Sequence, residues 1–295
     1  MLPQDSLVKD DQNWAMDTHA ILIPVFNGEA HIAATLESAL SQIGPIRILV
    51  SDDASTDGTA ATLDGYRKTA GIEVITQERN LGLFANWNFL LRSNTSPSFT
   101  LISQDDQFAS RDAVARGLEM LVQHPDCPAV FCDLEFVNDD GVSIGTRKFN
   151  RAARFNSGEW GRRSVIQCRN LFGIPLVVRR SAMIGKAFDE RIRYVADLGF
   201  AIAVCSGAPP AHVPEPLIKY RVHGSNASLR RQRHVLAEMR TLAAINSYHL
   251  SPLERARQRM FALATTAGRF ILFRSKRARL IAGWLSQRTA PGSNL

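Results

Sequence analysis

Two pairs of adjacent acids stand at the ends of apolar runs in this sequence. Asp52 and Asp53 end one run, and Asp105 and Asp106 end another. Neighbouring carboxylates in such positions are costly unless a cation neutralises part of their charge. Hard divalent cations such as Mg²⁺ and Mn²⁺ bind carboxylate oxygens and leave positions open for phosphate oxygens. Together the two pairs indicate a nucleoside diphosphate that is held through a divalent metal.

A purely structural explanation of each pair stays open. Asp and Thr side chains are common in solvated turns and as helix caps, and Thr56 and Asp57 fit that role. One acid pair in a turn is therefore weak support for a site. Two pairs that each follow an apolar run are stronger support. A carboxylate at such a place can also accept a hydrogen bond from the imide N–H of a pyrimidine base.

The elements that must position these acids alternate along the first half of the chain. Short apolar runs, typical of buried strands, alternate with stretches that have the apolar spacing of a helix. This alternation predicts a parallel sheet with helices on both faces, and such sheets bind ligands at the carboxyl ends of their strands. The expected strands are 20–26, 46–51, 72–76, 99–103 and 129–137, and the expected helices are 29–42, 58–69, 83–91 and 111–124.

The second half of the chain is less regular. Residues 146–172 are polar and rich in arginine, and their pattern predicts no element. From about residue 229 the pattern is helical to near the end. Between these two parts the expected elements are strands at 174–179 and 211–214, the second leading into 216–221, and a helix at 195–206.

The composition is that of a folded globular protein. The chain has 295 residues, of which 45% are hydrophobic and 21% charged, which argues against a disordered or fibrous protein. Its four cysteines form no Cys-x-x-Cys pair, so we expect a reducing compartment and neither a zinc site nor a disulfide framework. The aspartate-rich start does not resemble a signal peptide. Because no apolar run reaches about 18 residues, we also expect no membrane-spanning helix.

The positive charge is concentrated near the carboxyl end. The net charge of +7 divides into −4 for residues 1–228 and +11 for residues 229–295. Within 253–288 arginines interleave with large apolar residues, a composition that suits a helix lying on an anionic membrane surface. An equally good explanation is a helix that packs on the body and exposes a basic face. Nucleic acid fits less well, because no binding motif accompanies the charge.

The order and spacing of several motifs resemble the family-2 glycosyltransferases of the GT-A fold, over about residues 20–228. The subgroup that builds bacterial surface polysaccharides is the most similar. The motifs are Ile23-Pro24-Val25-Phe26-Asn27-Gly28, Ser51-Asp52-Asp53 with Asp57-Gly58-Thr59, Asn80-Leu81-Gly82 with Asn86-Trp87-Asn88, Gln104-Asp105-Asp106, Pro175 with Arg179, Asp197, and Glu215-Pro216-Leu217-Ile218 with Tyr220, Arg221 and His223.

The resemblance implies a role for individual residues in binding the donor nucleotide. Asp53 is similar to the acid that binds the base, and Asp105 to the acid near the ribose. Asp106 matches the ligand of a divalent cation, Mg²⁺ or Mn²⁺, and His223 matches a residue that joins the metal shell. The other implied donor-binding residues are Pro24 and Phe26, which line the base pocket in such enzymes, together with Asn27, Gly82 and Arg221.

The resemblance also implies a catalytic base. Asp197 matches the carboxylate that takes a proton from the acceptor hydroxyl in an inverting transfer. The family usually has Glu-Asp at this point, whereas this chain has Ala196 before the aspartate, so Glu190 and Asp189 are kept as alternatives. Acceptor-site residues are expected around Trp160 and 170–175, although a buried tryptophan is mainly a packing residue.

The sequence therefore predicts an α/β chain with an N-terminal tail (1–17), a GT-A domain (18–228) and a basic helical extension (229–295). The expected reaction moves a sugar from a nucleotide diphosphate sugar to a saccharide or lipid-linked saccharide hydroxyl, with inversion, in surface polysaccharide synthesis. The expected location is the cytoplasm, with peripheral attachment to the inner face of the plasma membrane.

Two other functions remain open at this stage. A nucleotidyltransferase also uses acids at strand ends and a divalent metal, but it should carry a Gly-rich basic loop near its first strand, and residues 24–29 contain none. A sugar-nucleotide-binding or scaffold protein that has lost catalysis is the other alternative. The alanine at position 196 is the feature that favours it.

Overall fold

The apolar runs of the first half form the parallel part of one twisted sheet. The computed structural model describes residues 18–149, 153–223 and 234–263. Four parallel strands lie side by side in the order β3-β2-β1-β4, and they confirm the alternation predicted from the sequence. Their bounds are β1 His19–Val25, β2 Ile46–Asp52, β3 Glu73–Thr76 and β4 Ser98–Leu101.

The second half completes this sheet in a mixed arrangement. Strand β8 (Pro175–Arg179) lies between β4 and β6 (Ala129–Val137) and is antiparallel to both. Beyond β6 follow β9 (Ala211–Arg221), which is parallel to it, and β5 (Gln107–Phe108), which is antiparallel to β9. Because β5 directly follows the second acid pair, its pairing with β9 brings that pair beside the end of β9.

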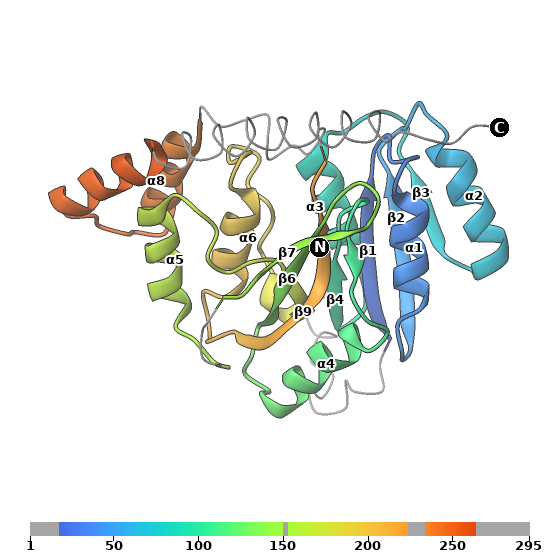
Figure 1. Ribbon diagram of the computed structural model, residues 1–295, viewed down its shortest axis with the longest axis horizontal. Helices are drawn as coiled ribbons and strands as arrows, with labels where there is room; N and C mark the ends of the chain where they lie inside the picture. Colours follow the sequence, from blue (N-terminus) through green and yellow to red (C-terminus); the bar gives the residue numbers. More distant parts are fainter. Residues whose placement is uncertain (1–17, 150–152, 224–233, 264–295) are drawn as a thin grey trace, which may run out of the picture.

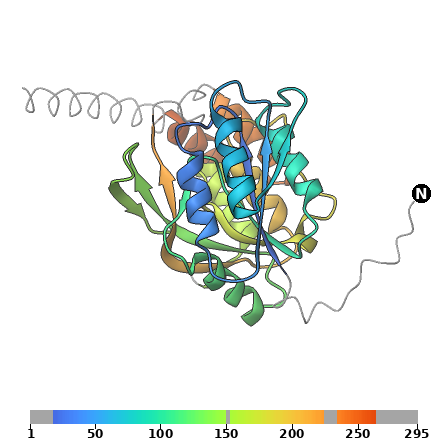
Figure 2. The same ribbon diagram turned by 90° about the vertical axis from the view of Figure 1, so that its right-hand side faces the viewer.

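Helices cover both faces of the sheet, as Figure 1 and the turned view in Figure 2 show. One buried cluster joins α1, α2 and α4 to strand residues such as Ile21 and Ile23. The other joins α3, α5, α6 and α8 to Leu22 and Leu49, so neighbouring residues of β1 face opposite cores. The bounds are α1 Ile32–Leu40, α2 Thr59–Ala70, α3 Leu83–Ser93, α4 Ala113–Gln123, α5 Ser157–Gln167, α6 Ala196–Val204 and α8 Val235–Ile245.

Several features differ from the sequence-based expectation. Strand β9 is continuous through Pro214 and Pro216, and register shifts against β6 around Asp133 accommodate the two residues that lack an N–H. The polar stretch without a predicted element contains α5 and the last residues of β7 (Ser143–Arg147), which pairs with β6. Both were missed because their residues are mostly polar and partly exposed.

The described part of the C-terminal extension packs on the body of the protein. Val235, Met239 and Leu242 of α8 are buried in the same core as α5 and α6. Residues 252–263 form a further helix after a break at 246–251. The N-terminal tail and the rest of the basic tail lie outside the described residues. In the part of the chain that is described, no helix is both long and apolar enough to cross a membrane.

Candidate active site

The ends of three parallel strands form the edge at which the predicted site residues gather. Val25 at the end of β1 pairs with Asp52 at the end of β2, and Leu22 pairs with Leu101 at the end of β4. The loops that leave these ends therefore start side by side. They carry the first acid pair, the segment after β1, and the second acid pair, as the sequence predicts.

Both carboxylates of the first acid pair accept hydrogen bonds from loop residues. Asp52 accepts hydrogen bonds from the backbone N–H and the hydroxyl of Ser55. The two carboxylate oxygens of Asp53 accept the N–H groups of Leu81 and Gly82, at 2.7 and 2.9 Å. Both acids are buried. Gly82 has a φ of 90°, a conformation that suits glycine, so the Asn-Leu-Gly motif is clamped to the end of β2.

The segment after β1 is held by the loop that contains the second acid pair. The Gln104 side chain accepts from the N–H of Phe26 at 2.7 Å and donates to its carbonyl at 3.2 Å. The Phe26 ring remains 42% exposed, whereas Pro24 within β1 is buried. Asn27 has a positive φ of 48°, and its side-chain oxygen accepts the N–H of Thr56 at 2.8 Å. An exposed aromatic ring on a rigid loop is suited to stacking with a base.

The two acids of the second pair point to different places. Asp105 lies 2.7 Å from Nε2 of His223, and both side chains are partly open to solvent. Asp106 is buried and accepts the backbone N–H of Arg221 at 3.0 Å. Burial, together with the neighbouring Asp105 carboxylate, raises the pKa of Asp106 well above its ordinary value. Asp105, not Asp106, therefore shares the open side of this loop with the histidine.

Arg221, which the resemblance assigns to donor binding, also holds the loops around the second acid pair together. Its guanidinium is buried and donates to the carbonyl oxygens of Asp105, Asn138 and Asp139, at 3.1, 2.9 and 2.6 Å. These bonds tie the end of β9 to two loops. Arg221 thus braces this part of the site, and its role in donor binding stays a prediction.

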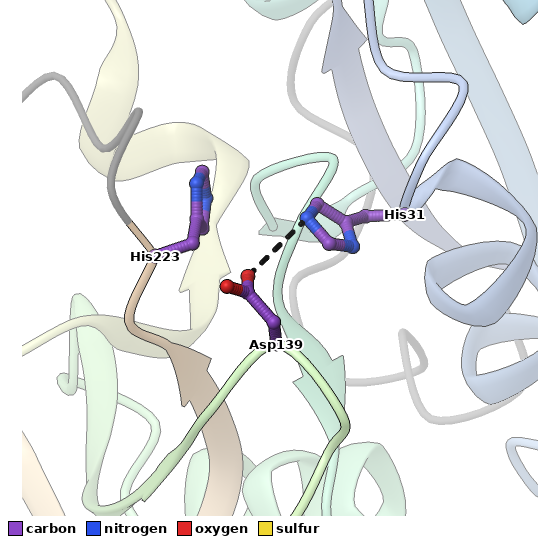
Figure 3. A group of neighbouring side chains, drawn as sticks. All are labelled: His31, Asp139 and His223. Atoms are coloured by element: carbon purple, nitrogen blue, oxygen red, sulfur yellow. Dashed lines mark ion pairs between the residues drawn. The ribbon is translucent and has the colours of Figure 1, made fainter. Parts of the chain in front are cut away.

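His31 and Asp139 join this group, although the sequence analysis assigned no role to either. Their side chains and that of His223 face one another, with potential ligand atoms within 4.8 Å of each other (Figure 3). Nε2 of His31 lies 3.9 Å from the Asp139 carboxylate, and the two imidazole centroids are 5.1 Å apart. Partial burial, followed by the charges of Arg221 and His223, lowers the pKa of His31. Nothing in the local sequence pattern of either residue could have predicted this proximity.

Asp197 lies in the first turn of α6 and is accessible to solvent. Its carboxylate accepts a hydrogen bond of 2.8 Å from the Asn170 side chain. The protein that surrounds it nevertheless desolvates this carboxylate and raises its pKa, while the Asn170 hydrogen bond opposes that shift. Asn170 also accepts the N–H groups of Phe172 and Gly173, so it fixes the segment predicted to line the acceptor site.

A carboxylate from the C-terminal extension supports the same turn. Glu238 of α8 accepts the backbone N–H groups of Tyr194 and Val195, at 2.5 and 3.0 Å. These two residues immediately precede Ala196, where the related enzymes usually have an acid. The chain thus lacks an acid at position 196, but Glu238 brings a carboxylate from α8 to the same turn.

The alternative base Asp189 is in a less suitable environment. It forms an ion pair with Arg191, at 2.6 Å, which lowers its pKa. A carboxylate held ionised by its own guanidinium partner is a weak base. Glu190 is exposed.

The β6–β7 hairpin links the two acidic centres. Its turn carries Asp139, and at its other end Arg147 pairs with Leu134 and donates a hydrogen bond to the carbonyl of Asn170. Val137 pairs with Ser143 at the turn end, three residues from Leu134 along β6. At about 3.3 Å per residue, the two ends of the hairpin are roughly 10 Å apart. Asp105 and His223 are thus connected to the turn end of the hairpin through Asp139, and Asn170 with Asp197 to its other end through Arg147.

Comparison with known proteins decides the family. Residues 20–183 match the model of the glycosyl transferase family 2, which is more than half of the chain. The chain belongs to glycosyl transferase family 2. The resemblance predicted from the motifs is therefore confirmed.

Relatives of this family 2 chain are distant. An uncharacterised glycosyltransferase of Haemophilus influenzae is 24% identical over 71% of this chain and 67% of its own length. An uncharacterised protein of Mycobacterium tuberculosis is 23% identical over 67% of this chain. This family 2 chain spans only 57% of the length of that mycobacterial protein. TuaG of Bacillus subtilis, whose name refers to teichuronic acid biosynthesis, is 27% identical over 42% of this chain and 50% of its own length.

Solved structures confirm the GT-A fold of this family 2 chain. Staphylococcus aureus TarS 1–349, in complex with UDP-GlcNAc, superposes with a TM-score of 0.64 and 17% identity, over 83% of this chain and 70% of its own. The mannosyltransferase PcManGT of Pyrobaculum calidifontis, in complex with GDP-Man and Mn²⁺, has a TM-score of 0.56 and 17% identity, over 90% of this chain and 81% of its own. The mixed sheet with its covering helices is thus an arrangement that known glycosyltransferases share.

Proposed function

We propose that this protein transfers a sugar from a nucleoside diphosphate sugar to the hydroxyl of a saccharide or a lipid-linked saccharide, with inversion. The observation that carries the proposal is the pair of acidic centres connected to the two ends of the β6–β7 hairpin. Asp105 with His223 would hold the diphosphate end of the donor, and Asp197 would receive the acceptor proton.

The donor would lie across the carboxyl edge of the parallel strands. The exposed Phe26 ring would stack on the base, and Asn27 and the clamped loop at Gly82 would shape the nucleotide pocket. Asp53 remains our candidate for contacting the base. Each of its carboxylate oxygens accepts one hydrogen bond from the Leu81–Gly82 backbone and can accept a second one from a base N–H.

The donor set at Asp105 and His223 fits a divalent cation, since carboxylate and imidazole are its common protein ligands. When bound, such a cation stabilises the negative charge that develops on the departing diphosphate. We assign this side of the site to Asp105, because Asp106 is buried against the backbone of Arg221. The residues that orient the pair are Gln104, which holds the loop to Phe26, and Thr35, which donates to the carbonyls of Gln104 and Asp106.

Asp197 would act as the general base. An inverting transfer needs a carboxylate that takes the proton of the attacking hydroxyl, and a raised pKa makes that carboxylate a better proton acceptor. Asn170 and Glu238 hold the turn in place, so the carboxylate is oriented before the acceptor binds.

Donor binding is the direct test of this function. We expect UDP- or GDP-sugars with Mn²⁺ to stabilise the full-length protein, by about 2.7 kcal/mol at one hundred times the Kd. For a chain of this size that corresponds to roughly 4 °C in Tm. The measurement is a thermal-shift screen, followed by NMR assignment of the anomeric configuration of the product. Absence of both stabilisation and sugar release for every nucleotide sugar would contradict the proposal, and retained configuration would contradict inversion.

The acceptor is proposed to be a growing cell-surface polysaccharide. The name of TuaG refers to teichuronic acid, and the chain shares its family. A lipid-linked acceptor of this kind would be met at the cytoplasmic face of the plasma membrane.

We propose that the C-terminal extension holds the enzyme at such a surface. Helix 252–263 is anchored on one side, where Glu254 pairs with Arg162 and the buried Gln258 side chain donates to the Val165 carbonyl at 3.2 Å. Its remaining surface exposes basic and large apolar side chains together. These are Arg255, Arg257 and Arg259 with Leu253, Met260 and Leu263.

Liposome flotation tests this attachment. Each basic residue near an anionic surface contributes about 1 kcal/mol, and salt weakens the attraction. Replacing the three exposed arginines of 252–263 with glutamine should therefore reduce flotation with anionic liposomes severalfold. A control variant removes three exposed basic side chains elsewhere, Lys68, Arg92 and Arg111. Equal flotation of the two variants, or flotation that does not depend on lipid charge, would contradict this attachment. Helix 252–263 would then only pack against the body of the protein.

A further inference from the structure

Three side chains from distant parts of the chain form a cluster, and only His223 of the three has a role in the function proposed above. His31 immediately precedes α1, Asp139 lies in the β6–β7 turn, and His223 follows the end of β9. Figure 3 shows the two imidazoles and the carboxylate directed toward a common space. Ligands of a metal with bonds of about 2.0–2.1 Å lie roughly 3.3 Å apart in a tetrahedral site. The observed separations, up to 4.8 Å, need only small side-chain rotations to reach that value.

The backbone around each of the three side chains is held in place. Arg221 donates to the Asp139 carbonyl at 2.6 Å, and the N–H of His31 donates to the Gly28 carbonyl at 3.0 Å. The Asp105 carboxylate lies 2.7 Å from Nε2 of His223, so it holds this imidazole and adds a second negative charge beside the cluster. The carboxylates of Asp105 and Asp139 together outweigh the single positive charge of Arg221. The cluster is thus prepared for a cation before any nucleotide arrives.

The chemistry of the donors points to the kind of cation. Imidazole nitrogens favour first-row transition metals, whereas Mg²⁺ prefers an octahedral shell of oxygens and retains several waters. We propose that His31, Asp139 and His223 form a site that binds a transition-metal dication without nucleotide and in preference to Mg²⁺. This inference deepens the proposed function, on which it rests for the use of the metal. The binding itself requires no donor.

Metal binding by the full-length, nucleotide-free protein tests the site. The loss of the free Mn²⁺ signal in electron paramagnetic resonance measures the Kd, and Mg²⁺ is added as a competitor. We expect Mn²⁺ to bind, and a tenfold excess of Mg²⁺ to displace little of it. We also expect His31→Gln and Asp139→Asn each to weaken Mn²⁺ binding about tenfold or more. The matched controls His124→Gln, outside the cluster, and Asp140→Asn, next to Asp139, should change the Kd less than twofold.

A second measurement guards against variants that fold poorly. Both substituted side chains are at least partly exposed, so circular dichroism should show intact secondary structure. Co²⁺ added to the wild-type protein should produce a visible absorption band that the His31→Gln variant lacks. The inference is overturned if the nucleotide-free protein binds no Mn²⁺ at millimolar concentration, or if the cluster variants bind it as the wild type does. Sugar transfer by a protein that fails this test would leave the proposed function intact and remove only the preformed site.

Discussion

Replacing Asp197 with asparagine is expected to lower the rate of sugar transfer by about 10²–10⁴-fold, the usual contribution of a general base. The Kd for the donor should remain close to the wild-type value, because the carboxylate acts on the acceptor proton in the transition state. Asparagine retains the shape of the side chain and can still pair with Asn170. The measurements are single-turnover transfer rates and donor titration by calorimetry.

The pH dependence of the same reaction gives a second readout. Desolvation by the surrounding protein raises the pKa of Asp197. As the pH is lowered, activity should therefore be lost at pH values above the ordinary aspartate pKa of about 3.9, because protonation removes the base. Asn170→Ala removes a hydrogen bond that favours the ionised form, and the acid limb of the kcat profile should therefore move to higher pH. A purely structural role for Asn170 would change the rate without moving that limb.

Asp189→Asn is the matched control for the base. Asp189 is a neighbouring acid whose pKa is lowered by Arg191, and its loss should change turnover little. If Asp189→Asn abolished transfer while Asp197→Asn did not, the base would have to be reassigned.

Replacing Asp105 with asparagine is expected to lower metal-dependent transfer at least about 10²-fold and to weaken donor binding in the presence of Mn²⁺. This carboxylate is the member of the second acid pair that stands beside His223 on the open side of the site. The loss of its charge removes a direct partner of a bound cation. Transfer rates and donor affinity should be measured over a range of Mn²⁺ concentrations.

Asp106→Asn is the control variant that shows which acid of the pair acts on the cation. The buried Asp106 accepts a hydrogen bond from the Arg221 backbone, and an asparagine oxygen can accept the same bond. We therefore expect a decrease of less than about tenfold, with unchanged dependence on Mn²⁺. The opposite result, a severe loss for Asp106→Asn and a mild one for Asp105→Asn, would restore the assignment made from the motif alone.

For the second acid pair, the motif predicts the location of the two acids but not the directions of their side chains. The sequence placed both acids directly after a strand. In the structure β4 ends earlier, at Leu101, and the acids lie in the turn that leads to β5. The motif did not show which acid faces the site, because the directions of side chains in a turn follow no local period. That direction depends on the pairing of β5 with β9, whose residues are more than a hundred positions apart in the sequence.

The turn that carries Asp197 shows the same division. Asp197 was identified from its match to the family, but its environment comes from two other segments. Asn170 is 27 residues away in the sequence, and Glu238 is more than 40 residues from the backbone N–H groups that it accepts. The boundary drawn before residue 229 separated Glu238 from the domain whose turn it supports.

The sequence by itself determined the alternating elements, the location of the acids at the carboxyl edge and the family. These follow from local spacing, which repeats every two residues in a strand and about every 3.6 in a helix. Only the tertiary structure decided that β8 lies antiparallel between β4 and β6. It also decided that Arg221 donates hydrogen bonds to backbone carbonyls, and that the side chains of His31, Asp139 and His223 lie close together. Such contacts depend on the paths of connecting loops and on the register of distant strands, which no local period encodes.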